Sequence, residues 1–289
     1  MQVRKPIVAG QFYPADEQGC IEEVQKCLEE RPLPELPEKI VSGIVPHAGW
    51  VFSGSLAGCV FAAIKKANLQ VETFIILGAA HSYFGPLPGV FDNGYWETPL
   101  GQIEIDKKFA EAVTDTEQAV SSTDAHLGEH SIEVQVPFIQ YLFPQARLVP
   151  IIVPPVQASI GLGKRLAEII LSSESEIVCV GSTDLTHYGP RYGFEPQGTG
   201  SSAIRWASEV NDQKFIEQAV RLKPDKMLST ASMDYNACGA GAAAAAVETA
   251  RSLGKTKGVL LAHSNSNEIM QKSMGTSSAE SVGYAGIIF

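Results

Sequence analysis

The chain has 289 residues, of which 45% are hydrophobic and 19% are charged, and this composition excludes wholesale disorder, a coiled coil and a fibrous repeat. Lysine and arginine total 22 against 32 aspartates and glutamates, for a formal net charge of −10, so we expect no nucleic-acid partner because an acidic surface repels phosphates. We also expect no membrane or secretory segment, because no apolar run reaches the roughly 18–20 residues of a membrane helix and Met1–Pro6 lacks the apolar core of a signal peptide.

Short apolar runs rich in β-branched residues predict the strands of a sheet. Runs that are apolar on both faces are typical of strands covered by helices on each side. In chain order they are Ile40–Val45, Phe74–Leu77, Leu148–Val153, Ile177–Val180 and Val259–Ala262, and the final run Ser281–Phe289 is expected to join them.

Helix-like patterns alternate with these runs, and they cover Glu17–Glu30, Ser55–Ala67, Asp106–Thr114, Ser131–Phe143, Ser159–Leu171, Ser202–Leu222 in one or two pieces, and Gly241–Leu253. The alternation predicts an α/β fold, with a mixed, mostly parallel central sheet and helices on both faces. Arg31–Glu38 is a stiff proline-rich connector, while Gly193–Ser202 and Ser264–Ser281 are predicted to be surface loops. Because no linker divides the chain, we expect residues 1–289 to form a single domain.

The five cysteines are odd in number and include no C-x-x-C pair; they are Cys20, Cys27, Cys59, Cys179 and Cys238. A chain of this size needs no disulfides for stability, so we expect reduced thiols and a cytoplasmic location. Cys238 differs from the others because it directly precedes an alanine-rich helix. The free amide groups at a helix start lower a thiol's pKa, so Cys238 is a candidate soft metal ligand or redox group. The alternative is a small buried apolar side chain.

Several histidines fall where predicted strands end. His47 follows the first strand and His81 the second, while Asp184 and His187 follow the strand at Ile177. His130 precedes a helix. Ligands gather at the carboxyl edge of parallel strands, so this placement favours one metal or catalytic site over unrelated structural histidines. Neutral imidazole suits iron, copper and zinc.

The segment Asp124–Glu133 contains H-x-x-E-H, an inverted zinc-protease signature. That motif requires both histidines, here His126 and His130, on one face of a helix. Gly128 and Ser131 instead indicate a loop that enters a helix. A zinc hydrolase therefore stands as an alternative function, behind the two considered below.

Six blocks of sequence resemble the Memo family, which is named for a human mediator of receptor-driven cell motility. They occur in the family's order and span nearly the whole chain: Pro6–Pro14, Pro46–Gly54, Leu77–Gly85, Glu129–Phe138, Gly181–Gly189 and Asn236–Gly239. The resemblance implies the fold of class III extradiol dioxygenases (LigB-type), which are non-haem Fe(II) enzymes that cleave catechol rings. It also implies a cytoplasmic metal-binding protein whose metal ligands match His47, His81 and Cys238.

The resemblance further implies three candidate catalytic residues. Asp184 and His187 match the pair beside the metal, and His130 lies with Glu129 in the loop near the mouth of the site. The dioxygenases use a carboxylate as the third ligand, whereas Cys238 offers a softer, oxidisable thiolate, which argues against ring cleavage. The leading hypothesis is an iron-binding, dioxygenase-type oxidoreductase that acts on a small chelating substrate, with copper or zinc as other possible metals. In it His187 moves the proton, and Asp184 orients that imidazole or binds substrate.

The alternative hypothesis is a non-catalytic module that binds metal or a peptide on a dioxygenase scaffold. The expected ligand is thus a small molecule or a peptide. In prokaryotic members, the resemblance also suggests an AMMECR-type protein and a radical-SAM enzyme as pathway partners.

Overall fold

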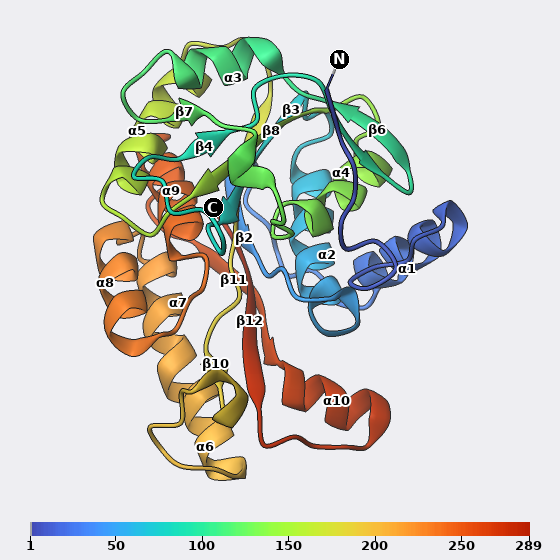
Figure 1. The fold of residues 1–289 in the computed structure, drawn as a ribbon, viewed down its shortest axis with the longest axis vertical. Helices are drawn as coiled ribbons and strands as arrows, with labels where there is room; N and C mark the ends of the chain where they lie inside the picture. The colour runs from blue at the N-terminus through green and yellow to red at the C-terminus, as the bar shows by residue number, and fades with distance from the viewer. Residues whose placement is uncertain (1) are drawn as a thin grey trace.

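The protein is described by a computed structural model over residues 2–289, and its largest sheet has nine strands (Figure 1). The order along the sheet is β10-β12-β2-β9-β3-β8-β4-β7, with β11 paired to β12. The bounds are β2 Ser42–Val45, β3 Thr73–Ala79, β4 Gly89–Val90, β7 Val120–Ser121, β8 Arg147–Val153, β9 Ile177–Ser182, β10 His187–Tyr188, β11 Val259–Asn265 and β12 Ser281–Ile288. A smaller sheet joins β1 (Val3–Arg4), β5 (Tyr95–Thr98) and β6 (Gly101–Glu104).

The centre of the large sheet is parallel. Strand β9 pairs in parallel with both β2 and β3, and β3 pairs in parallel with β8. All residues of β2, β3 and β9 are buried, as expected for strands covered on both faces. The predicted mixed sheet is therefore confirmed, and the chain segments after β2, β3 and β9 leave from the same edge.

Helices cover both faces of this sheet (Figure 1). One face packs against α2 (Trp50–Ala67), which in turn contacts α1 (Glu17–Glu29) and α4 (Val136–Leu142). The other face packs against α9 (Ala240–Ser252), which contacts α5 (Ala158–Leu171) and α8 (Pro224–Asp234); α3 (Lys107–Thr114) lies against α5. Within residues 2–289, every helix is too short or too polar to cross a membrane.

Helix α9 packs closely against strand β9 and helix α5, because glycines lie at both contacts. A side chain at Gly181 of β9 would meet the carbonyl oxygen of Ala242 at 2.7 Å, and one at Gly163 of α5 would meet that of Ala245 at 2.5 Å. Burying the alanine-rich helix against these glycines fixes its start beside the end of β9. This packing places Cys238, two residues before α9, at the carboxyl edge of the sheet.

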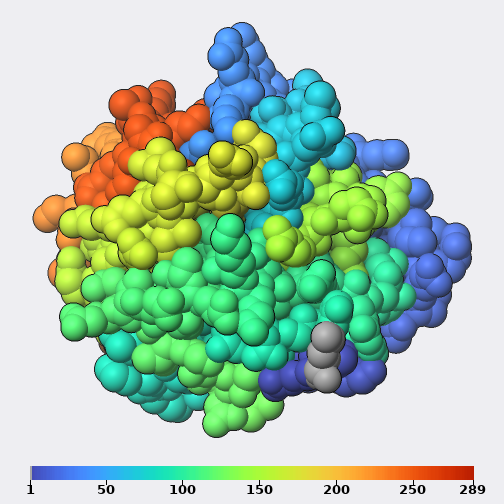
Figure 2. Space-filling model, turned by 90° about the horizontal axis from the view of Figure 1, so that it is seen from above, coloured from blue at the N-terminus to red at the C-terminus, as the bar shows by residue number. Residues whose placement is uncertain are grey.

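The opposite edge of the sheet, where β3, β8 and β9 begin, forms a continuous surface at the top of the molecule. Seen from above, the cyan segment before β3, the yellow-green segment before β8 and the yellow segment before β9 meet there beside α3 (Figure 2). Backbone hydrogen bonds join these segments, since Glu72 donates to Glu176 and Arg147 donates to Glu72. This end of the molecule is built by the starts of the strands rather than by the loops that carry the histidines.

Two predictions about the C-terminal third are wrong. The segment Ser264–Ser281, expected to be a loop, contains helix α10 (Ser266–Met274), whose first turn is capped by the Asn265 side chain accepting from the Glu268 N–H at 2.9 Å. The run at Val259 does form a strand, β11, but at the edge of the sheet rather than in its centre, because among residues 2–289 it pairs with β12 alone. Val259, Leu261 and Ala262 pack against the hydrophobic core, which explains the apolar composition of the run. The predicted helix over Ser202–Leu222 is α6 (Ser201–Trp206), a π-helical turn (Ala207–Asn211) and α7 (Asp212–Val220).

Candidate metal centre

His47 lies in the turn between β2 and α2, and only 2% of its surface is exposed. Residues at and just after the end of β9 form hydrogen bonds with both the backbone and the ring of His47. Its backbone N–H donates to Asp184 Oδ1 at 2.7 Å, and its ring atom Nδ1 lies 2.9 Å from Ser182 Oγ. Burial lowers the pKa of His47, opposed by the nearby Cys238. The ring is therefore held as a neutral imidazole with Nε2 facing the site.

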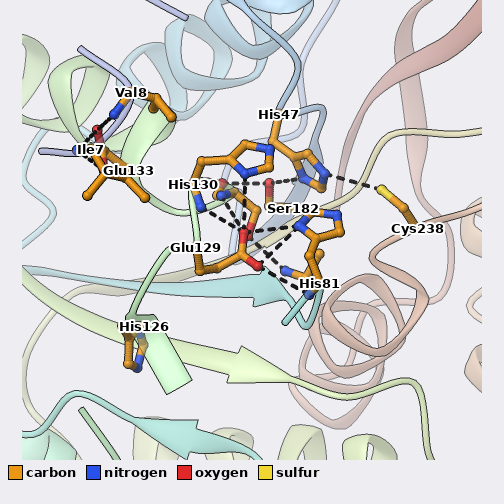
Figure 3. Close-up of polar contacts among 12 residues, drawn as sticks. Ile7, Val8, His47, His81, His126, Glu129, His130, Glu133, Ser182 and Cys238 are labelled. Carbon is orange, nitrogen blue, oxygen red and sulfur yellow. Dashed lines mark hydrogen bonds and ion pairs between the residues drawn. The ribbon is translucent and has the colours of Figure 1, made fainter. Parts of the chain in front are cut away.

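His81 follows β3 and is held by a carboxylate instead. Its Nδ1 lies 3.2 and 3.1 Å from the two oxygens of Glu129, and its backbone N–H donates to the same side chain at 3.2 Å (Figure 3). Burial lowers the pKa of His81, but the bonds to Cys238 and Glu129 outweigh it and raise that pKa to about 10. A carboxylate on Nδ1 fixes the ring and leaves Nε2 as the outward atom, as in many metal-binding histidines.

Cys238 lies just before α9, and its sulfur is 3.2 Å from His47 Nε2. Its backbone N–H donates to the Asp184 carbonyl at 3.3 Å, and the next N–H, of Gly239, donates to Thr183 Oγ1 at 2.9 Å. Burial raises the pKa of the Cys238 thiol, but the adjacent His47 and His81 outweigh it and lower that pKa to about 7. The other four cysteines are buried and have pKa values raised to about 12, chiefly by burial. Cys238 is thus the readily ionised thiol among them.

The structure brings His47, His81 and Cys238 together, with one donor atom from each lying within 4.8 Å of the others. A second group, His81, Glu129 and His130, meets the same distance limit. Its carboxylate is already occupied, because it accepts from His81 and from the backbone N–H groups of His130 and Ser131 at 2.8 Å each. Glu129 is therefore suited to hold ligands in place, and the first group is the better candidate for a metal site.

Two of the three candidate catalytic residues, His130 and Asp184, contact this group directly. The His130 ring stacks on His81 at 5.1 Å between centroids and meets His47 edge-on at 5.5 Å. The Asp184 carboxylate, whose pKa burial raises, accepts from the His47 and Ala48 N–H groups rather than orienting His187. His187 instead places Nδ1 3.0 Å from the Leu185 carbonyl, which leaves its Nε2 as a potential base.

His126, the other end of the H-x-x-E-H segment, is not part of either group that could hold a metal within residues 2–289. Residues 124–126 form one 3-10 turn and His130 lies in the loop beyond it, so the two histidines do not share a helical face. Its Nε2 lies 3.1 Å from the Gly89 carbonyl, and the ring packs edge-on against Trp96. Burial lowers the pKa of His126 to about 3. This arrangement disfavours a zinc hydrolase built on His126 and His130.

Sequence reasoning did not predict that Ser182 and Glu129 hold the rings of the two histidines. Ser182 was visible only as part of the block Gly181–Gly189, and the bond from Glu129 to His81 joins residues 48 apart. A second carboxylate, Glu133, is wholly buried and binds the N-terminal segment, accepting from Arg4 at 2.7 Å and from the Ile7 and Val8 N–H groups (Figure 3). Glu129 and Glu133 are four residues apart and both buried, and each has polar partners because charged groups are rarely buried without them.

Comparison with known proteins identifies the family of this chain. The Memo-like protein family matches residues 4–288. A MEMO1 family protein of Thermococcus onnurineus is 36% identical over 99% of both chains, and one of Caldivirga maquilingensis is 34% identical over 100% of this chain and 99% of its own. A third, from Pyrococcus furiosus, is 33% identical over 99% of this chain and 98% of its own. With the family matched from end to end, the chain belongs to the Memo family.

Proposed function

We propose that this protein binds a single redox-active metal ion, most favourably iron, through His47, His81 and Cys238. The observation that carries the proposal is the approach of three donor atoms from three separate loops to within 4.8 Å. Ligand bonds of about 2.0–2.3 Å at a tetrahedral angle separate neighbouring donors by about 3.6 Å. The Cys238 to His47 separation of 3.2 Å lies close to that value, so the donors fit a metal after small adjustments.

The chemistry of the donors supports this choice of group. Both histidines have their Nδ1 atoms engaged by Ser182 and Glu129, so each presents Nε2. The Cys238 thiol, with a pKa of about 7, ionises readily. Two imidazoles and a thiolate suit iron, copper or zinc, and a bound iron ion would supply one-electron chemistry and binding of a chelating substrate. Copper and zinc are the competing occupants of the same donors.

The chain's own residues would bind and move protons around the bound substrate. His187 accepts or donates a proton at Nε2, because its Nδ1–H is held by the Leu185 carbonyl. Asp184 keeps the His47 turn in place through backbone N–H groups. His130 stacks on His81 and contacts Phe12 at 4.9 Å between ring centroids, which covers one side of the site and limits access of water.

Metal analysis of protein purified without oxygen tests the proposal. We expect close to one iron per chain and a thiolate-to-iron absorption band that is lost in Cys238→Ala. Oxygen consumption by the iron-loaded protein, measured over a panel of catechols and thiols, then tests for oxidoreductase activity. A metal-free product that also takes up no added Fe(II), Cu or Zn would overturn the metal site itself.

A second candidate is a binding module without turnover, and the exposed side chains on the same loops favour it. Phe84 is 91% exposed three residues after His81, and Tyr235 is 68% exposed three residues before Cys238. Exposed large apolar side chains beside a site are typical of surfaces that contact another protein or peptide. Metal binding with no oxygen consumption over the whole panel would favour this function over the oxidoreductase.

A further inference from the structure

The hydroxyl group of Ser182 lies between the His47 ring and a backbone carbonyl. Its oxygen is 2.9 Å from His47 Nδ1 and 2.9 Å from the carbonyl oxygen of Ser131. All three residues are buried, with exposures of 0% for Ser182, 2% for His47 and 0% for Ser131. A buried hydroxyl with two polar neighbours has to distribute one proton between them.

The direction of each hydrogen bond follows from counting protons. The Ser131 carbonyl can only accept, so the bond to it requires the single proton of the Ser182 hydroxyl. The Ser182 oxygen can then only accept from His47, whose Nδ1 must carry a proton. The reverse arrangement would use the hydroxyl proton on Nδ1 and leave two oxygen acceptors facing each other at 2.9 Å without one, which is costly in a buried site.

We propose that Ser182 is a positioning residue that keeps the proton of His47 on Nδ1 and thereby directs the Nε2 lone pair at Cys238. The inference rests on the proposed metal site, in which Nε2 of His47 is the ligand atom. A histidine binds metal through an unprotonated nitrogen, and the hydrogen bond made by its other nitrogen decides which one that is.

Sheet register explains why the residue at the end of β9 can do this. Val45, the last residue of β2, is paired in parallel with Ser182, so the His47 turn leaves directly beside the Ser182 side chain. Two residues further on, Asp184 holds the His47 backbone at 2.7 Å. The end of β9 thus fixes the backbone with a carboxylate and the ring with a hydroxyl, and only the hydroxyl determines the tautomer.

The test is the protonation pattern of His47 in the metal-free protein, read from nitrogen-15 chemical shifts and long-range proton couplings at pH 6. We expect the Nδ1–H form in the wild type and a shift toward Nε2–H in Ser182→Ala. Ser42→Ala is the matched control. Ser42 lies on β2, the strand beside β9, is equally buried, and donates to the carbonyl of Ala246 in α9 at 2.9 Å. An Nε2–H form of His47 in the wild type would overturn the inference, and so would an Nδ1–H form that persists unchanged in Ser182→Ala.

Metal affinity provides the second measurement, with Co²⁺ as the probe and its thiolate charge-transfer band as the signal. Removing a group that orients a metal-binding histidine typically weakens metal binding by about 10–100-fold, and we expect this loss of Co²⁺ affinity in Ser182→Ala. We expect Ser42→Ala to keep the wild-type affinity. Ser182→Thr should also bind Co²⁺ as the wild type does, because it keeps a hydroxyl group. Equal affinities in Ser182→Ala and Ser42→Ala would argue against positioning. A wild type that binds no Co²⁺ would instead refute the proposed metal site, while the tautomer measurement would still judge Ser182.

Discussion

Histidines from two parts of the same sheet edge end in opposite surroundings. In the turns after β2 and β3, His47 and His81 each engage Nδ1 with a side chain and direct Nε2 toward Cys238. In the 3-10 turn at residues 124–126, His126 uses Nε2 on the Gly89 carbonyl, and its Nδ1 is buried without a hydrogen-bond partner. Both parts contain histidine, yet among residues 2–289 His126 belongs to neither group of metal donors.

His47 and His126 differ in the partners of their ring nitrogens and not in burial. His47 and His126 are equally buried, at 2% exposure each. Ser182 and Glu129 hold the inner nitrogens of the two candidate ligands and leave the outer ones free to meet. His126 has its polar contact to a carbonyl and aromatic rings on its sides, so its imidazole serves packing.

Removing the sulfur should have the largest effect on metal binding. We expect Cys238→Ser to weaken the affinity for Co²⁺ or Fe(II) by more than about 100-fold and to abolish the thiolate band, because a hydroxyl is a harder and weaker donor than a thiolate. Cys179→Ala is the control, since Cys179 is fully buried within β9 and outside the donor group. Full metal occupancy in Cys238→Ser would remove the sulfur from the ligand set.

Neutralising the carboxylate behind His81 should have a smaller effect. Glu129→Gln keeps the shape but loses the charge that favours the Nδ1–H form, so we expect metal affinity to fall by about 10–100-fold. Glu133→Gln is the matched control, because that carboxylate is equally buried but binds Arg4 and the N-terminal segment. Titration with Co²⁺ and thermal melting separate the two. A stronger loss of metal in Glu133→Gln than in Glu129→Gln would refute the assignment of Glu129 to the metal site and of Glu133 to the N-terminal segment.

The sequence predicts where the donors come from but not what holds them. Apolar runs ending in His47 and His81 identify strand ends, and parallel strands bring their ends to one edge, so convergence of these two was accessible. Cys238 reached the set through the family resemblance, since a cysteine before a helix is equally compatible with a buried apolar role. The hydrogen bond that the His47 ring donates to Ser182 depends on the register between β2 and β9, which local patterns do not encode.

The role of His126 can be tested by the pH dependence of stability, with no change expected in metal affinity. Its pKa is lowered from 6.5 to about 3 in the folded protein, so between these values the unfolded chain binds the extra proton. The contribution of His126 to the free energy of unfolding is therefore fully present above about pH 6.5 and is lost as the pH falls toward 3. At pH 5 the loss is about 2 kcal/mol, from 1.5 pH units at about 1.4 kcal/mol each.

Urea unfolding at pH 7 and pH 5 provides the measurement. The drop in unfolding free energy between the two pH values should be smaller by about 2 kcal/mol in His126→Gln than in the wild type, because glutamine does not titrate. The loss of the bond to Gly89 lowers the unfolding free energy of His126→Gln at both pH values, so it cancels when the drop between pH 7 and pH 5 is compared between the two proteins. The same drop in both proteins would show that another group causes the acid sensitivity.

Only a small effect on metal content is expected at His187. Its ring contacts Tyr192 at 5.1 Å between centroids, its Nδ1 bonds the Leu185 carbonyl, and it does not belong to either donor group. His187→Ala should leave metal stoichiometry and the thiolate band within about twofold of the wild type. If the protein is an oxidoreductase, the same substitution should lower turnover by about 10²–10⁴-fold, the usual contribution of a general acid or base.

A purely structural role for His187 predicts a different pair of results. In that case His187→Ala would lower the melting temperature, because the Leu185 bond and the Tyr192 contact are lost, and activity per folded molecule would stay unchanged. His187→Gln separates the two, since its amide can donate to the Leu185 carbonyl but cannot act as a base at neutral pH. Restored melting with turnover still low would assign His187 to proton transfer. Loss of metal from either variant would instead indicate that His187 is a metal ligand, as proposed here for Cys238.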